Sequence, residues 1–295
     1  MFIVLSCLFW VVSYIYPNEI NLNFLETSFI RGISRLLFSG TMCLYRGESL
    51  DIDPRYLAPV AIRSIAMVLD TLIFGLSQFF LPIPIVHTIG STGTLFIVLL
   101  DYLINGVKLN NKQIAGLVIS FAGMILVING EWLITYIDPT YETKTDFQNY
   151  HSDNPFVAMI VGLALALNML LWAYSCLCLR MVPNYSSNQW LVQQGVFLIL
   201  GTAVFYDKVP QKADPMVYLI GIILIGIPSN LNFVLTTLGF QLAKNTSNIS
   251  MLFFSPIIFG YVFSIFRYHE SQNMVCLVGI ILIVFGIAKT IINKA

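Results

Sequence analysis

Long apolar runs separated by short polar segments recur along the whole chain. A helix that crosses a membrane core of about 30 Å needs about 20 mostly apolar residues. Five such runs precede residue 131, at about Phe2 to Tyr16, Phe29 to Tyr45, Tyr56 to Phe80, Ile83 to Leu103 and Ile114 to Gly130. Five more follow residue 155, at about Phe156 to Val182, Trp190 to Tyr206, Met216 to Phe240, Ile249 to Phe266 and Val275 to Ile292. The pattern predicts an all-α integral membrane protein with ten transmembrane helices.

The second half repeats the layout of the first half 163 residues later. Gly279 and Gly286 stand opposite Gly116 and Gly123 at this offset. Because each half holds an odd number of spans, the two copies must have opposite orientations in the membrane. We therefore expect two inverted-topology five-helix repeats joined by a loop. The predicted boundaries are 1–130 for the first repeat, 131–155 for an acidic linker loop and 156–295 for the second repeat.

Composition supports a multi-pass membrane protein. Hydrophobic residues make up 57% of the 295 positions and charged residues 10%, with a mean hydropathy of +0.81, whereas soluble domains carry about 25% charged residues. A net charge of zero offers no basic face for nucleic acid. The five cysteines lie in or beside apolar runs, which predicts buried thiols and neither a disulfide framework nor a metal site. An internal organelle membrane, including the mitochondrial inner membrane, and the plasma membrane both remain open as locations.

The third span contains a carboxylate, Asp70, near its middle. A charge at that depth is costly, so the side chain should face the interior of the helix bundle. Arg63 lies seven residues earlier on nearly the same helix face. Three interpretations stay open: an Arg63/Asp70 pair, an interhelical hydrogen bond, and a role in substrate binding or proton coupling.

The fourth span begins with a dense series of prolines and glycines, which permits broken helix geometry. His87 and Ser91 share a face at i and i+4. His87 is interpreted either as a hydrogen-bonded structural residue or as a proton acceptor, because its ordinary titration range is close to neutrality.

The eighth and ninth spans carry further polar residues. At the 163-residue offset Ser250 stands opposite His87, and Gln241 opposite Gln78. Asn168 and Trp172, one turn apart on the sixth span, could add an amide and an aromatic platform. The same residue types also hold membrane helices together, so packing is the alternative role. The candidates for a substrate cavity or for coupling, with no catalytic or metal-binding residue among them, are Asp70, Gln78, His87, Thr88, Ser91, Thr92, Asn168, Trp172, Ser229, Asn230, Asn232, Gln241, Asn245, Asn248 and Ser250.

The second half resembles the EamA-type repeat of the drug/metabolite transporter superfamily. Its pattern has Pro in the fourth helix, Glu just before the fifth and Gly-x6-Gly within the fifth, and the matching residues are Pro256, Glu270, Gly279 and Gly286. Trp172 is similar to the tryptophan of the first helix of such a repeat, as is Trp10 in the first half, and Arg31 resembles an arginine often found early in the second helix.

The first half departs from this pattern. At the 163-residue offset Gly93 stands in the place of Pro256, and Val107 in the place of Glu270. The resemblance implies a ten-helix secondary transporter with two inverted repeats, and it extends over essentially the whole chain.

Residue types and motifs that the sequence lacks narrow the range of possible solutes and activities. The fourth and ninth spans contain no Lys or Arg before their ends, which disfavours a phosphorylated solute unless Arg31, Arg35 or Arg63 reach inward. The chain shows no phosphate loop, paired-carboxylate site or nucleophile arrangement, so neither an enzyme nor a cofactor is expected.

We therefore predict a secondary transporter of a small polar metabolite, neutral or zwitterionic rather than phosphorylated. It would alternate access to a midplane cavity built chiefly from spans three, four, eight and nine. The alternative is a transport-inactive structural subunit of a larger membrane complex, which the degraded first repeat and the sparse intramembrane charge would favour. The expected partners are a small solute and the lipid bilayer, and both a homodimer and membership of a larger complex stay open.

Overall fold

The computed structural model describes residues 1–20, 22–81, 83–137, 155–182, 185–204, 214–242, 250–268 and 274–292. These residues are almost entirely helical and include no strand, so the predicted all-α class is confirmed. The helices before residue 138 are α1 (Phe2–Glu19), α2 (Phe24–Arg46), the short η1 (Pro54–Tyr56), α3 (Leu57–Phe80), α4 (Ile83–Ser91), α5 (Gly93–Asn105) and α6 (Asn111–Ile137). Those after residue 154 are α7 (Pro155–Met181), α8 (Ser187–Ala203), α9 (Pro215–Gly221), η4 (Ile222–Gly226), α10 (Ile227–Leu242), η5 (Met251–Phe254), α12 (Ser255–Tyr268) and α13 (Met274–Ile292).

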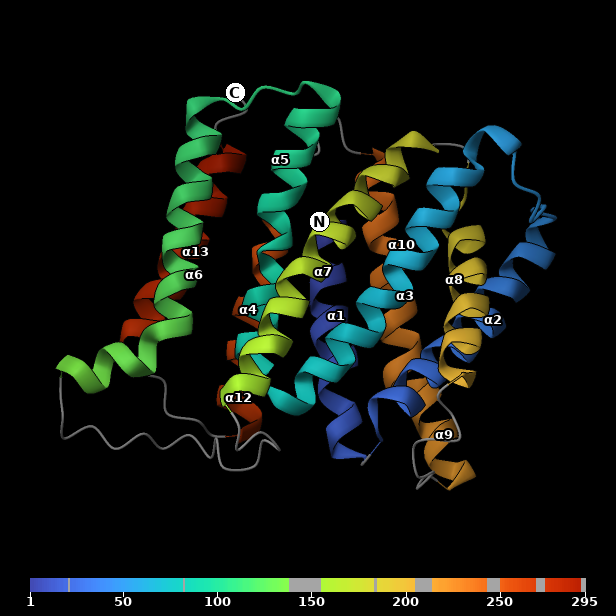
Figure 1. Cartoon of the computed structure of the whole chain (residues 1–295), viewed down its shortest axis with the longest axis horizontal. Helices are drawn as coiled ribbons and strands as arrows, with labels where there is room; N and C mark the ends of the chain where they lie inside the picture. Colours follow the sequence, from blue (N-terminus) through green and yellow to red (C-terminus); the bar gives the residue numbers. More distant parts are fainter. Residues whose placement is uncertain are drawn as a thin grey trace. The chain divides into compact units, whose positions relative to one another are not determined.

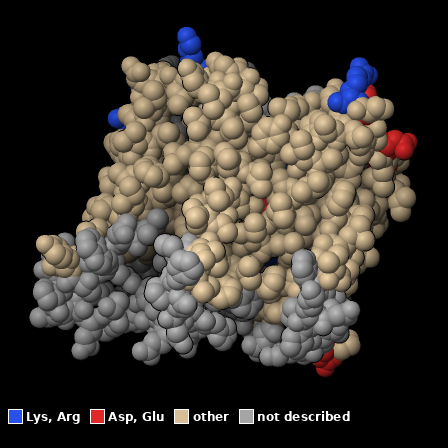
Figure 2. Space-filling model, viewed as in Figure 1, with Lys and Arg blue, Asp and Glu red and all other residues tan. Residues whose placement is uncertain are grey.

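Within the described residues, four helical segments are long and apolar enough to cross a membrane: Pro54–Ser77, Val86–Asn105, Ile160–Leu179 and Pro215–Leu242. Four shorter apolar segments lie at Phe2–Tyr14, Asn111–Val127, Leu252–Phe263 and Met274–Lys289. On the face shown in Figure 2, nearly all of the described surface is uncharged, as expected for helices that face lipid.

Two of the predicted spans are interrupted in the structure. The fourth divides into α4 and α5 at Thr92, within the glycine-rich segment. In the eighth span, η4 is a π-helical turn in which the N–H of Ile227 bonds to the carbonyl of Ile222. Pro228 follows immediately, and because it has no N–H it cannot continue the regular hydrogen-bond series. The predicted linker 131–155 starts as helix, since α6 continues to Ile137, and residues 138–154 lie outside the described part.

The chain divides into two compact units, and each unit draws on both halves of the sequence. Unit 1 comprises Met1–Leu76 and Leu167–Lys244, and unit 2 comprises Ser77–Ala166 and Asn245–Ala295. Within unit 1, α1 packs along α10 and α2 along α8; within unit 2, α6 packs along α13 (Figure 1).

The starts of α2 and α8 in unit 1 use the same local chemistry. Before α2, Asn23 accepts a hydrogen bond from the N–H of Glu26 at 2.8 Å, and the Glu26 carboxylate accepts one from the N–H of Asn23 at 3.0 Å. Ser186 and Gln189 form the same capping box before α8. Both boxes satisfy N–H groups that the first helical turn leaves unpaired. The two boxes are 163 residues apart, at the offset found in the sequence.

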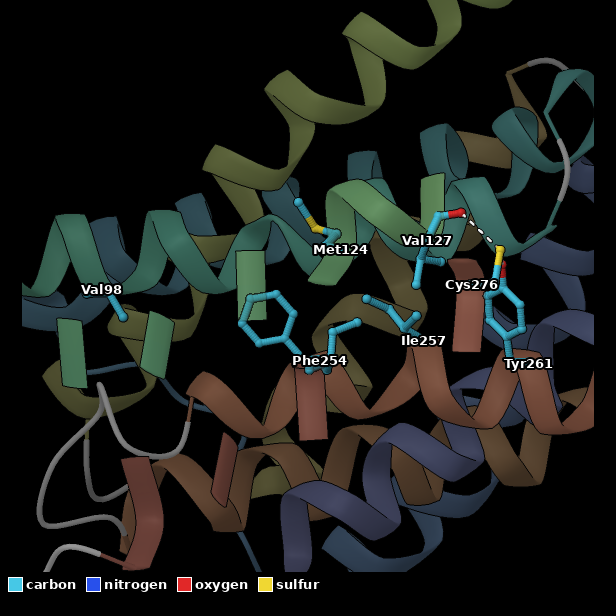
Figure 3. Packing of buried hydrophobic residues seen from close by; sticks show 8 residues of the cluster. Val98, Met124, Val127, Phe254, Ile257, Tyr261 and Cys276 are labelled. Carbon is cyan, nitrogen blue, oxygen red and sulfur yellow. Dashed lines mark hydrogen bonds between the residues drawn. The ribbon is translucent and has the colours of Figure 1, made fainter. Parts of the chain in front are cut away.

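The hydrophobic core of unit 2 joins α5, α6, η5, α12 and α13. Its buried members are Val98, Met124, Val127, Phe254, Ile257, Tyr261, Cys276 and Ile283 (Figure 3). The Tyr261 hydroxyl lies 3.1 Å from the Cys276 sulfur, which lies 3.7 Å from the Val127 carbonyl oxygen. All five cysteines are buried, as predicted.

The glycines of α6 and α13 allow these helices to touch backbone to backbone. A Cβ atom built on Gly123 would lie 2.5 Å from the carbonyl oxygen of Gly279, and one on Gly279 would lie 2.7 Å from that of Gly123. A Cβ atom on Gly286 would lie 2.6 Å from the carbonyl oxygen of Gly116. The glycine spacing therefore serves close helix packing.

Candidate functional site

Asp70 is buried in α3, and its partner is an amide on another helix. Its side chain is 8% exposed, and Oδ1 accepts a hydrogen bond from Nδ2 of Asn168 in α7 at 2.9 Å. The structure therefore contains the interhelical hydrogen bond that the sequence left open. Within the described residues, no ion pair joins Arg63 and Asp70.

Arg63, two turns before Asp70 on α3, lies between aromatic rings. Its Cζ atom is 5.1 Å from the Trp190 ring centroid and 5.0 Å from that of Phe233. Its Nη1 donates to the backbone carbonyl of Ser175 and approaches the Ser175 hydroxyl at 3.4 Å. Cation–π contacts and a carbonyl acceptor thus take the place of a carboxylate partner for this charge.

Arg31 and Arg35 lie one turn apart on α2, and both are buried. Arg31 places its Cζ atom 3.7 Å from the Tyr14 ring centroid, and its Nη2 donates to the Ser13 carbonyl at 2.8 Å. Among the described residues, the hydrogen-bond acceptor of Arg35 is the Ser229 hydroxyl, at 3.5 Å. A charged side chain at the membrane centre costs about 2.5 to 3.5 kcal/mol on insertion scales. The three buried guanidinium groups described in unit 1 therefore carry a high energetic cost, which indicates a functional role.

Ser229 and Asn230 of α10, both predicted site residues, face α2. Nδ2 of Asn230 donates to the Ser34 hydroxyl at 3.0 Å, while its Oδ1 is buried without a partner among the described residues. Asn232, on the same helix, accepts from the Thr236 hydroxyl at 3.4 Å. The structure thus brings Ser229 and Asn230 beside the buried arginines of α2, whereas Asn232 bonds within its own helix.

Gln241 and Trp172 have local structural contacts. Gln241 donates to the backbone carbonyl of Tyr185 at 3.0 Å, which ties the end of α10 to the segment before α8. Burial raises the pKa of the Tyr185 phenol to about 12, so this group stays neutral at physiological pH. Trp172 is partly exposed, and its carbonyl accepts a hydrogen bond from the Ser175 hydroxyl at 2.7 Å.

Among the predicted candidates of unit 2, Ser91 and Thr92 bond to nearby backbone carbonyl groups. His87, Thr88, Ser91 and Ser250 are buried. The Ser91 hydroxyl donates to the His87 carbonyl at 2.9 Å, which confirms that the two residues share a helix face, and the Thr92 hydroxyl donates to the Ile89 carbonyl at 2.6 Å. Gln78 lies in α3, but its side chain is outside the description, as are Asn245, Asn248 and the motif residue Glu270.

Gln194 and Asp101 are buried polar residues that were not among the predicted candidates. Gln194 of α8 is fully buried, and neither polar atom of its side chain has a partner among the described residues. Asp101 of α5 is fully buried and accepts from Asn105 at 2.7 Å. Both sit in apolar runs, so the rule that singled out Asp70 could have found them.

Comparisons with known proteins show similarity to a transporter family and to a solved structure. Residues 1–129 match the EamA-like transporter family, so the predicted resemblance is confirmed over these residues. The match falls on the half whose motif is the more degraded. No curated protein matches the chain. A solved structure titled only "Crystal structure of protein" is similar, with a TM-score of 0.74 and 15% identity, covering 98% of this chain and 94% of that one; at this identity it shows the fold alone.

The family match and the apolar helices together indicate the class of protein. The chain is an integral multi-pass membrane protein, and its residues 1–129 match a family of transporters. The buried polar groups of unit 1 are therefore candidates for binding a solute that crosses the bilayer.

Proposed function

We propose that this protein is a secondary transporter that moves a small polar solute across its membrane by alternating access. The observation that carries the proposal is the set of ionisable side chains buried in unit 1, which are Glu26, Arg31 and Arg35 of α2 and Arg63 and Asp70 of α3. Groups of this kind are costly in a membrane and characteristically mark the path of a substrate or an ion. The EamA-like match of residues 1–129 supports the same class.

Two inverted five-helix repeats are the architecture that we propose for this mechanism. Residues 163 apart meet one another in both units: Gly32 and Gly195 touch between α2 and α8, and the Ser120 hydroxyl lies 3.5 Å from the Ile283 carbonyl between α6 and α13. Such contacts between equivalent residues are expected where a pseudo-two-fold axis passes between two copies of one helix. The paired capping boxes of α2 and α8 add to this support.

The solute class follows from the charges of unit 1. The expectation of a neutral or zwitterionic solute was conditional on Arg31, Arg35 and Arg63 not reaching inward. All three are buried, with exposed fractions of 1%, 4% and 1%. A zwitterion remains suitable because the unit offers both guanidinium groups and the Asp70 carboxylate, and an anionic group is no longer disfavoured.

Asp70 and His87 are the residues that we propose for coupling to protons. Asp70 lies among polar groups of unit 1, and His87 is buried in unit 2. A carboxylate and an imidazole are the side chains that most readily exchange protons.

The test is solute uptake and proton flux in liposomes containing the purified protein. Wild-type protein should show saturable uptake of at least one solute from a panel of amino acids, organic acids, sugars and amines. The double variant Asp70→Asn/His87→Ala should lose pH-gradient-driven uptake, while solute exchange at equal pH on both sides should persist. An absence of flux across the whole panel, together with stoichiometric co-purification in a large complex, would instead support the structural-subunit alternative.

A further inference from the structure

The three buried arginines of unit 1 differ in how fully their donors are used. Arg31 has the Ser13 carbonyl and the Tyr14 ring, and Arg63 has Ser175 and two aromatic rings. Arg35 has one hydrogen bond among the described residues, from Nη2 to the Ser229 hydroxyl at 3.5 Å, which is the outer limit of a hydrogen bond. Its Nε and Nη1 atoms are buried without an acceptor among the described residues.

The surroundings of Arg35 are polar and confined. Ser229 and Asn230 lie across from it on α10, and Asn230 is joined to Ser34, the residue before Arg35. On its other side the side chain begins close to α8, since a Cβ atom built on Gly195 would lie 3.2 Å from Cβ of Arg35. The Phe233 ring centroid is 6.0 Å from Cζ of Arg35 and 5.0 Å from Cζ of Arg63. A guanidinium with unused donors, two hydroxyls and an amide therefore converge at one place.

The buried charges of unit 1 do not balance. In their charged forms, the buried residues Arg31, Arg35 and Arg63 carry three positive charges, and Glu26 and Asp70 carry two negative ones. Glu26 is already held by its capping box and by the Tyr218 hydroxyl at 3.3 Å, and Asp70 by Asn168. Among the described buried residues of unit 1, one positive charge is therefore in excess. Arg35 has the most donors without an acceptor there, Nε and Nη1, whereas Arg31 and Arg63 each have only Nε.

We propose that Arg35, with Ser229 and Asn230, binds an oxyanion group of the transported solute, a carboxylate or a phosphate. This inference rests on the proposed transport function and specifies its substrate class. The planar guanidinium can form two parallel hydrogen bonds with a carboxylate or a phosphate, and the Ser229 hydroxyl and the Asn230 amide can rotate to complete the coordination. A zwitterion satisfies the same requirement through its carboxylate end.

Binding can be measured independently of transport. Purified protein in phosphatidylcholine nanodiscs is titrated with acetate, succinate, inorganic phosphate, choline and glucose at constant ionic strength, and thermal stability is followed. At least one of the three anions should raise the melting temperature in a saturable manner, and choline and glucose should not. The same titration with an anionic lipid, phosphatidylglycerol, distinguishes a soluble anion from a lipid headgroup; saturable stabilisation by the lipid alone would overturn the assignment to a solute.

Three variants assign the effect to one side chain. Arg35→Gln removes the charge and should weaken anion binding by about tenfold or more. Arg35→Lys keeps the charge but loses the two-point geometry, so it should bind with intermediate affinity and provides the comparison if Arg35→Gln does not fold. Arg55→Gln is the matched control, since this arginine is 84% exposed beside Asp53. Equal anion binding by wild type and both Arg35 variants would overturn the proposal.

The outcomes separate this inference from the transport proposal. Uptake of neutral or cationic solutes by wild-type liposomes, without stabilisation by any anion, contradicts the Arg35 site and leaves transport intact. Anion binding that depends on Arg35, without any flux, supports the site and contradicts transport.

Discussion

The side-chain amide of Asn168 in α7 donates a hydrogen bond to Oδ1 of Asp70 in α3 across 2.9 Å. Both side chains are buried, and the two residues are 98 positions apart in the sequence. This bond ties together two long helices and holds a carboxylate in an apolar setting. Its energetic role can be tested separately from any role in coupling.

We predict that Asn168→Ala lowers the free energy of unfolding by about 1 to 3 kcal/mol, because it leaves the buried carboxylate without its donor. Asp70→Asn should cost less, because its carbonyl oxygen can still accept from Asn168. In the double variant the two effects should not add, since both changes act on the same bond: Asn168→Ala removes its donor, and Asp70→Asn removes the charge of its acceptor. Denaturation of the four proteins of this cycle in detergent measures the coupling, and strict additivity would contradict a direct bond.

Arg63 should not be replaceable by lysine. The planar guanidinium stacks between Trp190 and Phe233 while it donates to Ser175, a geometry that an ammonium group cannot reproduce. Arg63→Lys should therefore destabilise the protein by about 1 to 3 kcal/mol. Arg55→Lys, at an exposed position, is the comparison and should lie close to wild type in the same thermal unfolding experiment. Equal stability of the two variants would argue against a structural role for the Arg63 stack.

Close packing of α6 against α13 predicts a position-specific effect of one methyl group. Gly123→Ala places Cβ 2.5 Å from the backbone oxygen of Gly279, so the helices must separate, and we expect a loss of about 1 to 3 kcal/mol. Gly260→Ala in α12 meets no atom within 4 Å and should be neutral or slightly stabilising. Melting temperatures of the two variants measure this difference, and a neutral Gly123→Ala would show that the contact is looser than described.

The capping box before α8 should contribute measurably to stability through Ser186. Ser186 accepts from Gln189 and also donates to the Glu48 carboxylate at 2.5 Å, so its hydroxyl joins the segment after α2 to α8. Ser186→Ala should cost about 0.5 to 2 kcal/mol. The adjacent Ser187→Ala serves as the control. Hydrogen exchange in the first turn of α8 should rise in the first variant and not in the second; unchanged exchange in Ser186→Ala would contradict the capping role.

Much of the fold could be predicted because membrane helices carry a strong signal in their length and apolarity. The predicted spans at 56–80 and 156–182 agree closely with α3 and α7. The π-helical turn at Ile222–Gly226 was not predicted, although Pro228 beside it was visible in the sequence. A proline indicates that the hydrogen-bond series must break but not which local geometry repairs it.

The candidate site was predictable as a set of residues and not as an arrangement. The rule that buried polar groups in membrane helices are exceptional found Asp70, Asn168, Ser229 and Asn230, and it passed over Gln194 and Asp101 because no motif drew attention to them. The ten-helix count, the inverted repeats and the candidate cavity stay predictions.

The sequence by itself determined the class of protein, the all-α fold and the likeness to EamA-type transporters, because these depend on composition, on local periodicity and on residues at fixed spacings. Only the tertiary structure decided the partners of the charged groups. Arg63 and Asp70 share a helix face, yet Arg63 bonds to Ser175, 112 residues away, and Asp70 to Asn168. Partners at such separations are set by how distant helices pack, and that packing leaves Arg35 with donors still free.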